Sequence, residues 1–100
     1  MAKRLKSVLT NDMEHCYITG SPNVAVHHVF PGTGRRGICE KYGFIVPLVP
    51  ELHNASKHSV HNNPNTGLDL ILKERCQRYF EENFGTREEF ISEFGKSYIW

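Results

Sequence analysis

Apolar residues recur at four-residue spacing along one stretch of the chain, and this repeat constrains the fold more than any other feature. The repeat consists of Leu68, Leu72, Cys76, Phe80 and Phe84, and Ile71 and Tyr79 widen it. Residues four apart lie on one face of an α-helix. The pattern therefore predicts an amphipathic helix over residues 67–84, and Gly85 follows it as a stop signal.

A second, shorter helix is expected directly after the first. Thr86-Arg87-Glu88-Glu89 has the form of a capping box, in which the threonine and the second glutamate satisfy the first backbone N–H groups. The apolar face of this helix would consist of Phe90, Ile91 and Phe94. Gly95 closes the helix. The apolar tail 98–100 then either packs onto the body or contributes to a homodimer.

The first third of the chain has strand character. Residues 14–19 and 24–30 contain β-branched and aromatic residues, and the turn-forming cluster 20–23 separates them. We expect the two segments to pair as an antiparallel hairpin, which residues 31–34 end. The basic segment 1–13 reads as a loosely ordered lead-in.

The middle of the chain carries weaker signals. Residues 35–42 are compatible with a short helix or with an ordered loop. The apolar stretch 44–48 contains Pro47, which limits it to an edge segment. Pro50 suits the first position of a helix that extends to about Lys57, and residues 58–66 are polar and turn-rich.

Length and composition limit the class of protein. A chain of 100 residues is of single-domain size and buries only about two thirds of its unfolded surface. No apolar run approaches the roughly 20 residues that cross a bilayer. The basic start lacks the apolar core of a secretory signal. We therefore expect an α+β domain in the cytoplasm, without membrane contact.

Net charge and cysteine content exclude two further arrangements. The formal charge of +1 excludes a polybasic arm as the main device for binding nucleic acid, although a local basic patch remains open. The three cysteines do not form a C-x-x-C pair, and an odd number argues against a disulfide framework. Cys39 and Cys76 are expected to be packing residues.

The histidines are the candidate functional residues. His27 and His28 are adjacent on an expected strand, so one faces inward and one outward unless a bulge or strand end lets both flank one site. His53 lies near the start of the helix expected at residue 50, and His61 follows eight residues later. Three imidazoles would bind a divalent metal and leave positions open for substrate. His58 is near enough to replace His61.

An ordered series of motifs supports a family resemblance. The series runs His27-His28-Val29-Phe30-Pro31-Gly32, Arg35-Arg36, Glu40-Lys41-Tyr42-Gly43-Phe44, Val46-Pro47-Leu48, His53-Asn54, Val60-His61 and Gly85-Thr86-Arg87-Glu88-Glu89-Phe90. In this order the motifs resemble small phage-encoded HNH (ββα-metal) endonucleases, and the resemblance covers about residues 14–98. It implies one domain over residues 14–100. A β-hairpin plus helix core would span about 14–63, and two additional C-terminal helices about 67–95.

The resemblance also implies roles. His28 would be the general base that deprotonates the attacking water. His27, His53 and His61 would hold one divalent metal ion (Mg, Mn, Ni or Zn), which acts as a Lewis acid on the scissile phosphate. DNA phosphates would contact basic residues after the histidine strand, and two polar residues would orient the ligands. The basic residues are Arg35, Arg36 and Lys41, and the polar residues are Asn54 and Ser56.

The sequence departs from the family pattern in two ways. Many relatives carry a structural zinc on cysteines, but here the first pair reads Cys16-Tyr17-Ile18-Thr19 and the segment 49–52 has no cysteine, so no structural zinc is expected. The central asparagine that braces the base is replaced by Phe44 or Ile45, with Asn54 as a weak substitute. The expected function is a DNA endonuclease in phage DNA processing within a bacterial host cell. The alternative is an inactive HNH-fold module that binds nucleic acid or protein, for example an inhibitor of a host system.

Overall fold

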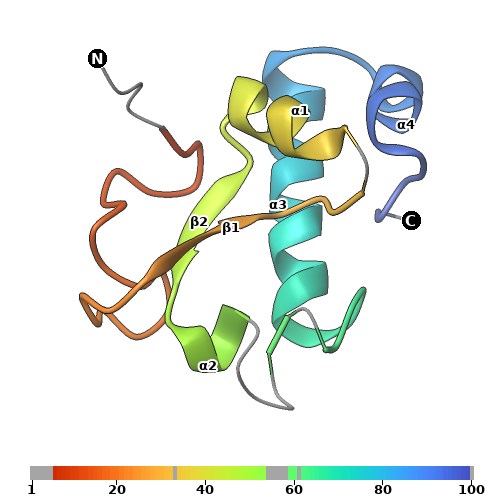
Figure 1. Cartoon of the computed structure of the whole chain (residues 1–100). Coiled ribbons are helices and arrows are strands. Elements are labelled where there is room, and N and C mark those ends of the chain that lie inside the picture. The colour runs from red at the N-terminus through yellow and green to blue at the C-terminus, as the bar shows by residue number, and fades with distance from the viewer. Residues whose placement is uncertain (1–5, 33, 54–58, 61, 100) are drawn as a thin grey trace.

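The computed structural model describes residues 6–32, 34–53, 59–60 and 62–99. Two strands and four helices follow one another along the chain (Figure 1). They are β1 (Ala25–His28), α1 (Arg35–Tyr42), β2 (Ile45–Leu48), α2 (Pro50–His53), α3 (Gly67–Asn83) and α4 (Arg87–Phe94). The expected α+β class is therefore confirmed at this coarse level.

The two strands pair with each other in an antiparallel sheet. Ala25 lies opposite Leu48 and His28 lies opposite Ile45. Helix α1 connects the strands, so they are not joined by a tight turn. The expectation that Pro47 allows only an edge strand holds, because both strands of a two-stranded sheet are edges.

The predicted pairing of residues 14–19 with residues 24–30 is wrong. Residues 14–19 form turns, in which the Cys16 N–H donates to Ser21 O at 2.8 Å. This segment lies along the other edge of β2, where the Tyr17 N–H donates to Pro47 O at 2.8 Å. The physical reason is burial: every residue of β2 is buried, so the Pro47 carbonyl needs a hydrogen-bond donor, and the Tyr17 N–H supplies it.

The sequence left open whether residues 35–42 form a short helix or an ordered loop, and they form helix α1. The helix ends at Gly43, whose φ of +78° is left-handed and whose N–H donates to Cys39 O. A Cβ atom at Gly43 would lie 2.9 Å from Lys6 O, so this glycine also allows the N-terminal segment to approach. Helix α2 begins at Pro50 as expected and is described as far as His53. The predicted continuation to Lys57 lies outside the described residues.

The two C-terminal helices occur where the apolar spacing predicts them. In α3, Leu72, Cys76 and Phe80 are buried, whereas Phe84 is 48% exposed just beyond the helix end. Three polar side chains share the buried face with them, namely Asp69, Lys73 and Gln77. In α4 the capping box between Thr86 and Glu89 is complete, and two phenylalanines face inward.

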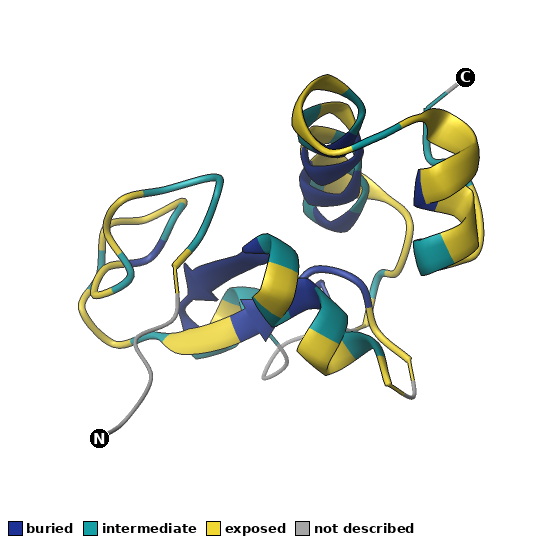
Figure 2. Cartoon of the chain, turned by 90° about the horizontal axis from the view of Figure 1, so that it is seen from above, coloured by how far each residue is buried: buried dark blue, intermediate teal, exposed yellow. Residues whose placement is uncertain are grey.

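An aromatic cluster joins the helices to the sheet. The Phe30 ring, just beyond β1, contacts four other rings at centroid distances of 4.5–5.9 Å. These rings belong to Phe44, Phe90, Phe94 and Tyr98. Helices α3 and α4 lie together on one side of the strands (Figure 2). The tail therefore packs onto the body through Tyr98.

The buried cysteines take part in the same core. Cys39 and Cys76 are both 0% exposed, which confirms their expected role as packing residues. None of the helices in the described part of the chain is both long and apolar enough to cross a membrane.

Candidate functional site

His27 and His53 come together from different elements. His27 lies on β1 and is 2% exposed. Its ring centroid is 5.3 Å from that of His53, at an interplanar angle of 69°. The fold explains this contact, because β1 pairs with β2 and α2 follows β2 after a single residue. The His53 N–H donates to Val49 O at 3.0 Å, the hydrogen bond of an α-helical turn that directly follows β2.

His28 occupies the more exposed side of the strand. Its side chain is 14% exposed, and Nε2 lies 2.7 Å from Oε2 of Glu40 on α1. The two adjacent histidines thus have different surroundings, as alternation along a strand requires. Of the two arrangements left open by the sequence, the described strand favours one histidine inward and one outward.

A shallow pocket of about 270 Å³ lies beside these histidines. Its lining consists of Val26, His28, Phe30, Pro31, Gly32, Arg36 and His53. His53 therefore both contacts the buried His27 and lines the pocket that contains His28. The pocket lining thus includes the imidazoles of His28 and His53 and the guanidinium of Arg36, and the buried His27 contacts the His53 ring.

The three basic residues expected to contact DNA occupy different positions. Arg36 lines the pocket, with a side chain that is 81% exposed and a weak contact of 3.8 Å from Nε to Glu40 Oε2. Arg35 points elsewhere, since a Cβ atom at Gly95 would lie 2.8 Å from Arg35 Nη2. Its guanidinium therefore lies against the carboxyl end of α4. Lys41 is exposed, and its Nζ lies 5.3 Å from the centre of the Tyr42 ring.

The remaining expected site residues are His61, its alternative His58, Asn54 and Ser56. All four lie outside the described residues. Within the described part of the chain, no group of three or more His, Cys, Asp or Glu side chains could hold a metal together. The described donor groups at or beside the pocket are the imidazoles of His27, His28 and His53 and the carboxylate of Glu40.

Glu40 is the residue that the sequence reasoning missed. It belongs to the motif at residues 40–44, but it received no role. Its position four residues after Arg36 was the available signal, because residues four apart on a helix are neighbours. The contact with His28 depends on how α1 packs against β1, which no local pattern specifies.

The positions expected to replace the central asparagine are purely structural. Phe44 and Ile45 are both 0% exposed and belong to the apolar core. They contribute no polar group to the pocket. Among the described residues, Glu40 is the group that hydrogen-bonds to the His28 imidazole.

The Cys16 thiol lies in a polar turn. Burial raises its pKa, but hydrogen bonds from the Thr19 side chain and from the backbone of Thr19, Ile18 and Val49 outweigh burial and lower the pKa overall. The turn at residues 16–19 thus meets the start of α2 through Val49.

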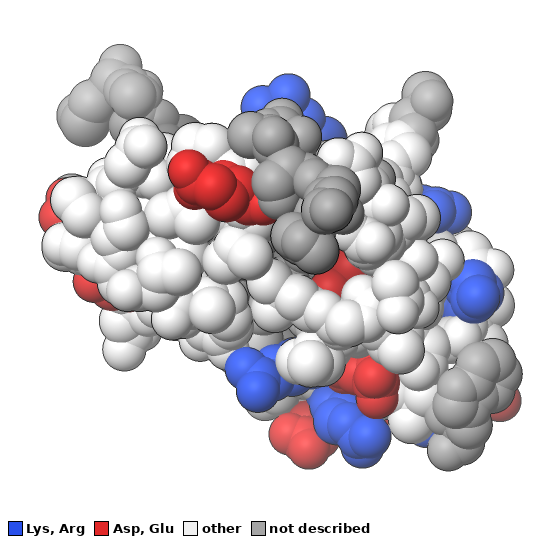
Figure 3. Space-filling model, turned by 90° about the horizontal axis from the view of Figure 1, so that it is seen from below, with Lys and Arg blue, Asp and Glu red and all other residues white. Residues whose placement is uncertain are grey.

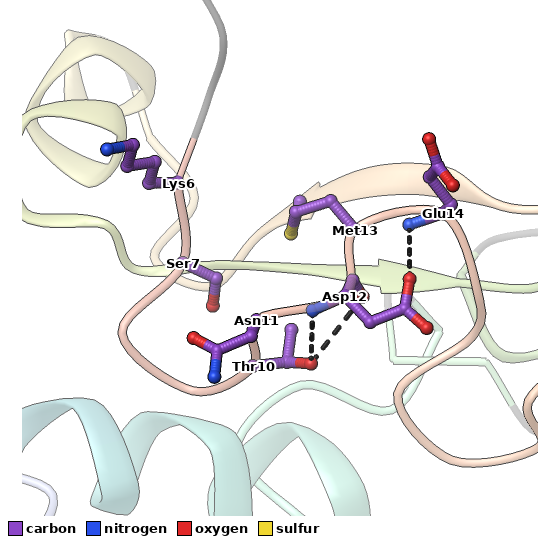
Figure 4. Close-up of a pocket in the computed structure, with 7 residues that line it drawn as sticks. All are labelled: Lys6, Ser7, Thr10, Asn11, Asp12, Met13 and Glu14. Carbon is purple, nitrogen blue, oxygen red and sulfur yellow. Dashed lines mark hydrogen bonds between the residues drawn. The ribbon is translucent and has the colours of Figure 1, made fainter.

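A larger hollow of about 490 Å³ lies in the N-terminal loop (Figure 4). Its lining consists of Lys6, Ser7, Thr10, Asn11, Asp12, Met13 and Glu14, none of which lines the histidine pocket. The Asp12 carboxylate accepts from the Glu14 N–H at 3.0 Å, and this bond lowers its pKa. Its other oxygen lies 2.8 Å from His15 Nδ1. The polar groups of this loop are therefore used to close the loop itself.

Charged side chains are dispersed on the face seen from below (Figure 3). Lysine and arginine atoms form small separate groups there, interspersed with acidic ones. This distribution agrees with the formal charge of +1. Any contact with a polyanion on this face would depend on individual basic residues.

Comparisons with known proteins do not indicate a function, so the interpretation of the site rests on its geometry. No family model matches the sequence, and comparisons with curated proteins and with solved structures return no significant similarity.

Proposed function

We propose that the protein is a metal-dependent DNA endonuclease of the HNH type, which hydrolyses phosphodiester bonds. The contact between the His27 and His53 imidazoles, beside a pocket that holds His28, is the observation that carries this proposal. Two imidazoles from a strand and a helix, with a third one nearby on the same strand, match a division between metal ligands and a base.

His27 and His53 would hold the divalent ion, and His61 or His58 would supply the third ligand. When bound, the ion would act as a Lewis acid toward the scissile phosphate. His28 would accept the proton of the attacking water, because imidazole titrates near neutral pH in general and can serve as a base there. Asn54 and Ser56 remain candidates for orienting the ligands.

DNA would be held beside the histidines by Arg36. Its guanidinium is exposed at the pocket and can form paired hydrogen bonds with a phosphate. Lys41 and Arg35 are weaker candidates, since neither lines the pocket. Backbone contacts of this kind carry no base information, so we propose little sequence preference, as suits phage DNA processing in a host cytoplasm.

Cleavage of supercoiled plasmid tests the proposal. We expect the purified protein to convert the plasmid to the nicked form in Mg²⁺, Mn²⁺ or Ni²⁺. His28→Ala should abolish nicking while metal binding survives, and His15→Ala, which changes an exposed histidine of the N-terminal loop, should cleave like the wild type. Plasmid that stays intact with the wild type across these metals contradicts the enzyme proposal.

The burial of Phe44 and Ile45 favours a second candidate function. With these apolar residues in place of a bracing asparagine, the chain would be an inactive HNH-fold module that binds nucleic acid or a protein partner. Retention of DNA in a gel-shift assay, together with intact plasmid, would support this function over the enzyme.

A further inference from the structure

We infer that Glu40 is a positioning residue that fixes the orientation and tautomer of His28, leaving the lone pair of the neutral ring on Nδ1. The catalytic part of this inference rests on the proposed nuclease function. The geometric part rests on a single contact, in which His28 Nε2 lies 2.7 Å from Glu40 Oε2.

The chemistry of the two groups assigns the hydrogen. An ionised carboxylate can only accept hydrogen bonds, so the hydrogen in this contact belongs to His28 Nε2. A neutral imidazole then carries its lone pair on Nδ1. No described residue forms a hydrogen bond with Nδ1, which leaves this atom as the basic nitrogen of the ring. In this arrangement a carboxylate orients the imidazole that would act as the base.

The position of Glu40 is fixed by its neighbours on α1. The preceding residue, Cys39, is fully buried, and its thiol donates to Phe30 O at 3.4 Å. Cys39 and Glu40, which are consecutive in α1, thus contact Phe30 and His28 respectively. Beyond α1, the Val29 N–H donates to Phe44 O at 3.0 Å. These contacts tie the helix to the strand, so the carboxylate is delivered to the imidazole by the fold.

Arg36 completes the arrangement on the pocket side. Its Nε lies 3.8 Å from the same Glu40 oxygen that contacts His28, and its side chain is 81% exposed. An exposed pair of this kind contributes little to stability. Glu40 is itself 32% exposed, so its replacement should leave the protein folded.

Nitrogen NMR of the imidazole tests the geometric part without any activity measurement. In the wild-type protein, we expect His28 to show the Nε2–H tautomer. In Glu40→Ala we expect a mixture of tautomers, and in Glu82→Ala, which changes an exposed glutamate of α3, the wild-type signals. A His28 tautomer that is the same in Glu40→Ala as in the wild type overturns the inference.

Steady-state kinetics on a DNA substrate tests the catalytic part. Glu40→Ala should lower kcat by about 10- to 100-fold with little change in KM, as for other residues that orient a catalytic group. Glu40→Gln keeps an oxygen acceptor at the same length, so its kcat should lie between those of the wild type and Glu40→Ala. A kcat for Glu40→Ala equal to that of Glu82→Ala overturns the positioning role. If the wild type does not cleave DNA, the proposed function fails, and the NMR result still decides the contact.

Discussion

Lys73 Nζ lies 2.8 Å from Asp69 Oδ2 inside the protein, where the two side chains are 3% and 5% exposed. The same two groups close the turn that precedes α3. Lys73 Nζ donates to Asn65 Oδ1 at 2.8 Å, and the Asn65 N–H donates to Asp69 Oδ2 at 2.6 Å. Asn65 has a φ of +60°, a conformation that asparagine tolerates better than most residues. The buried pair therefore links α3 to the segment before it.

Removal of one partner should destabilise the protein strongly. Lys73→Met would leave the Asp69 carboxylate buried without its cation, which typically lowers the free energy of unfolding by about 3–5 kcal/mol. Urea denaturation measures this loss. Arg78→Met, at an exposed position of the same helix, is the matched control.

A double variant separates the charge from the packing. Asp69→Asn combined with Lys73→Met removes both charges and keeps an oxygen acceptor for the Asn65 N–H. We expect it to recover most of the stability that Lys73→Met loses. A double variant no more stable than Lys73→Met would show that the ion pair is not the cause.

Metal binding should stabilise the wild-type protein through His27 and His53. A ligand that binds the folded state at about 100 times its Kd adds about 2.7 kcal/mol to the free energy of unfolding. We expect Ni²⁺ or Mn²⁺ to raise Tm in the wild type and in His15→Ala, and to raise it much less in His53→Ala or His27→Ala. The measured quantity is the difference in Tm with and without metal for each variant. The stability lost by removing the buried His27 side chain affects both measurements and therefore cancels. An unchanged difference in either variant would remove that histidine from the ligand set.

The helices could be predicted from the sequence because their signals are local. The four-residue repeat that begins at Leu68 and the capping box at Thr86 each specify a single helix. Strand pairing is not local. Residues 14–19 have the composition of a strand, but β1 pairs instead with β2, which lies beyond an inserted helix. Composition identifies strand-forming segments, but it does not specify which of them become neighbours.

The candidate site, like the strand pairing, could be predicted only in part from the sequence. The pairing of His27 with His53 was part of the expected ligand set, and the fold does place the two rings in contact. The role of Glu40 depends on the packing of α1 on β1 and could not be derived from spacing. Arg35 and Arg36 look equivalent in the sequence. Once α1 is a helix, neighbouring residues point about 100° apart, and the two guanidinium groups separate.

Arg36 and Arg35 should therefore respond differently to substitution. Arg36→Ala should weaken DNA binding for all sequences and reduce the slope of log K against log salt by about 1, because one phosphate contact is lost. Arg35→Ala should leave that slope unchanged and lower Tm, because its guanidinium packs against α4. Fluorescence anisotropy over a salt series measures the slope, and calorimetry measures Tm. Equal slopes in the wild type and Arg36→Ala would exclude the proposed phosphate contact.

A side chain at Gly95 should destabilise the end of α4, mainly through the backbone. Its φ of +96° disfavours any L-residue, and a Cβ atom would lie 2.8 Å from Arg35 Nη2. We expect Gly95→Ala to lower the free energy of unfolding by about 1–2 kcal/mol. The close atom is the end of a flexible side chain that can move away, so the loss should be nearly the same in an Arg35→Ala background. A loss that disappears in that background would show that the contact with Arg35, and not the backbone, is the cause.

Buried thiols should make the fold sensitive to alkali. Burial raises the pKa of the Cys76 thiol well above its ordinary value of 9.0, and neighbouring Cys39 adds to the effect. A group whose pKa is higher in the folded state stabilises that state fully below its unfolded pKa. The contribution is lost as the pH rises from there toward the folded pKa. We therefore expect the free energy of unfolding to fall above about pH 9, by up to about 1.4 kcal/mol per pH unit for this one thiol.

Cys76→Ala should flatten this alkaline decline, although the protein is less stable at neutral pH because a buried group is lost. Cys16→Ala is the informative control, since the pKa of Cys16 is lowered in the folded state. Its thiolate contributes stability that builds up as the pH rises toward the ordinary pKa of 9.0 and is constant above it, so its removal should leave the decline above about pH 9 unchanged. Urea denaturation at several pH values between about 8 and 10.5 measures both slopes. A decline above about pH 9 that is as steep in Cys76→Ala as in Cys16→Ala would contradict the prediction.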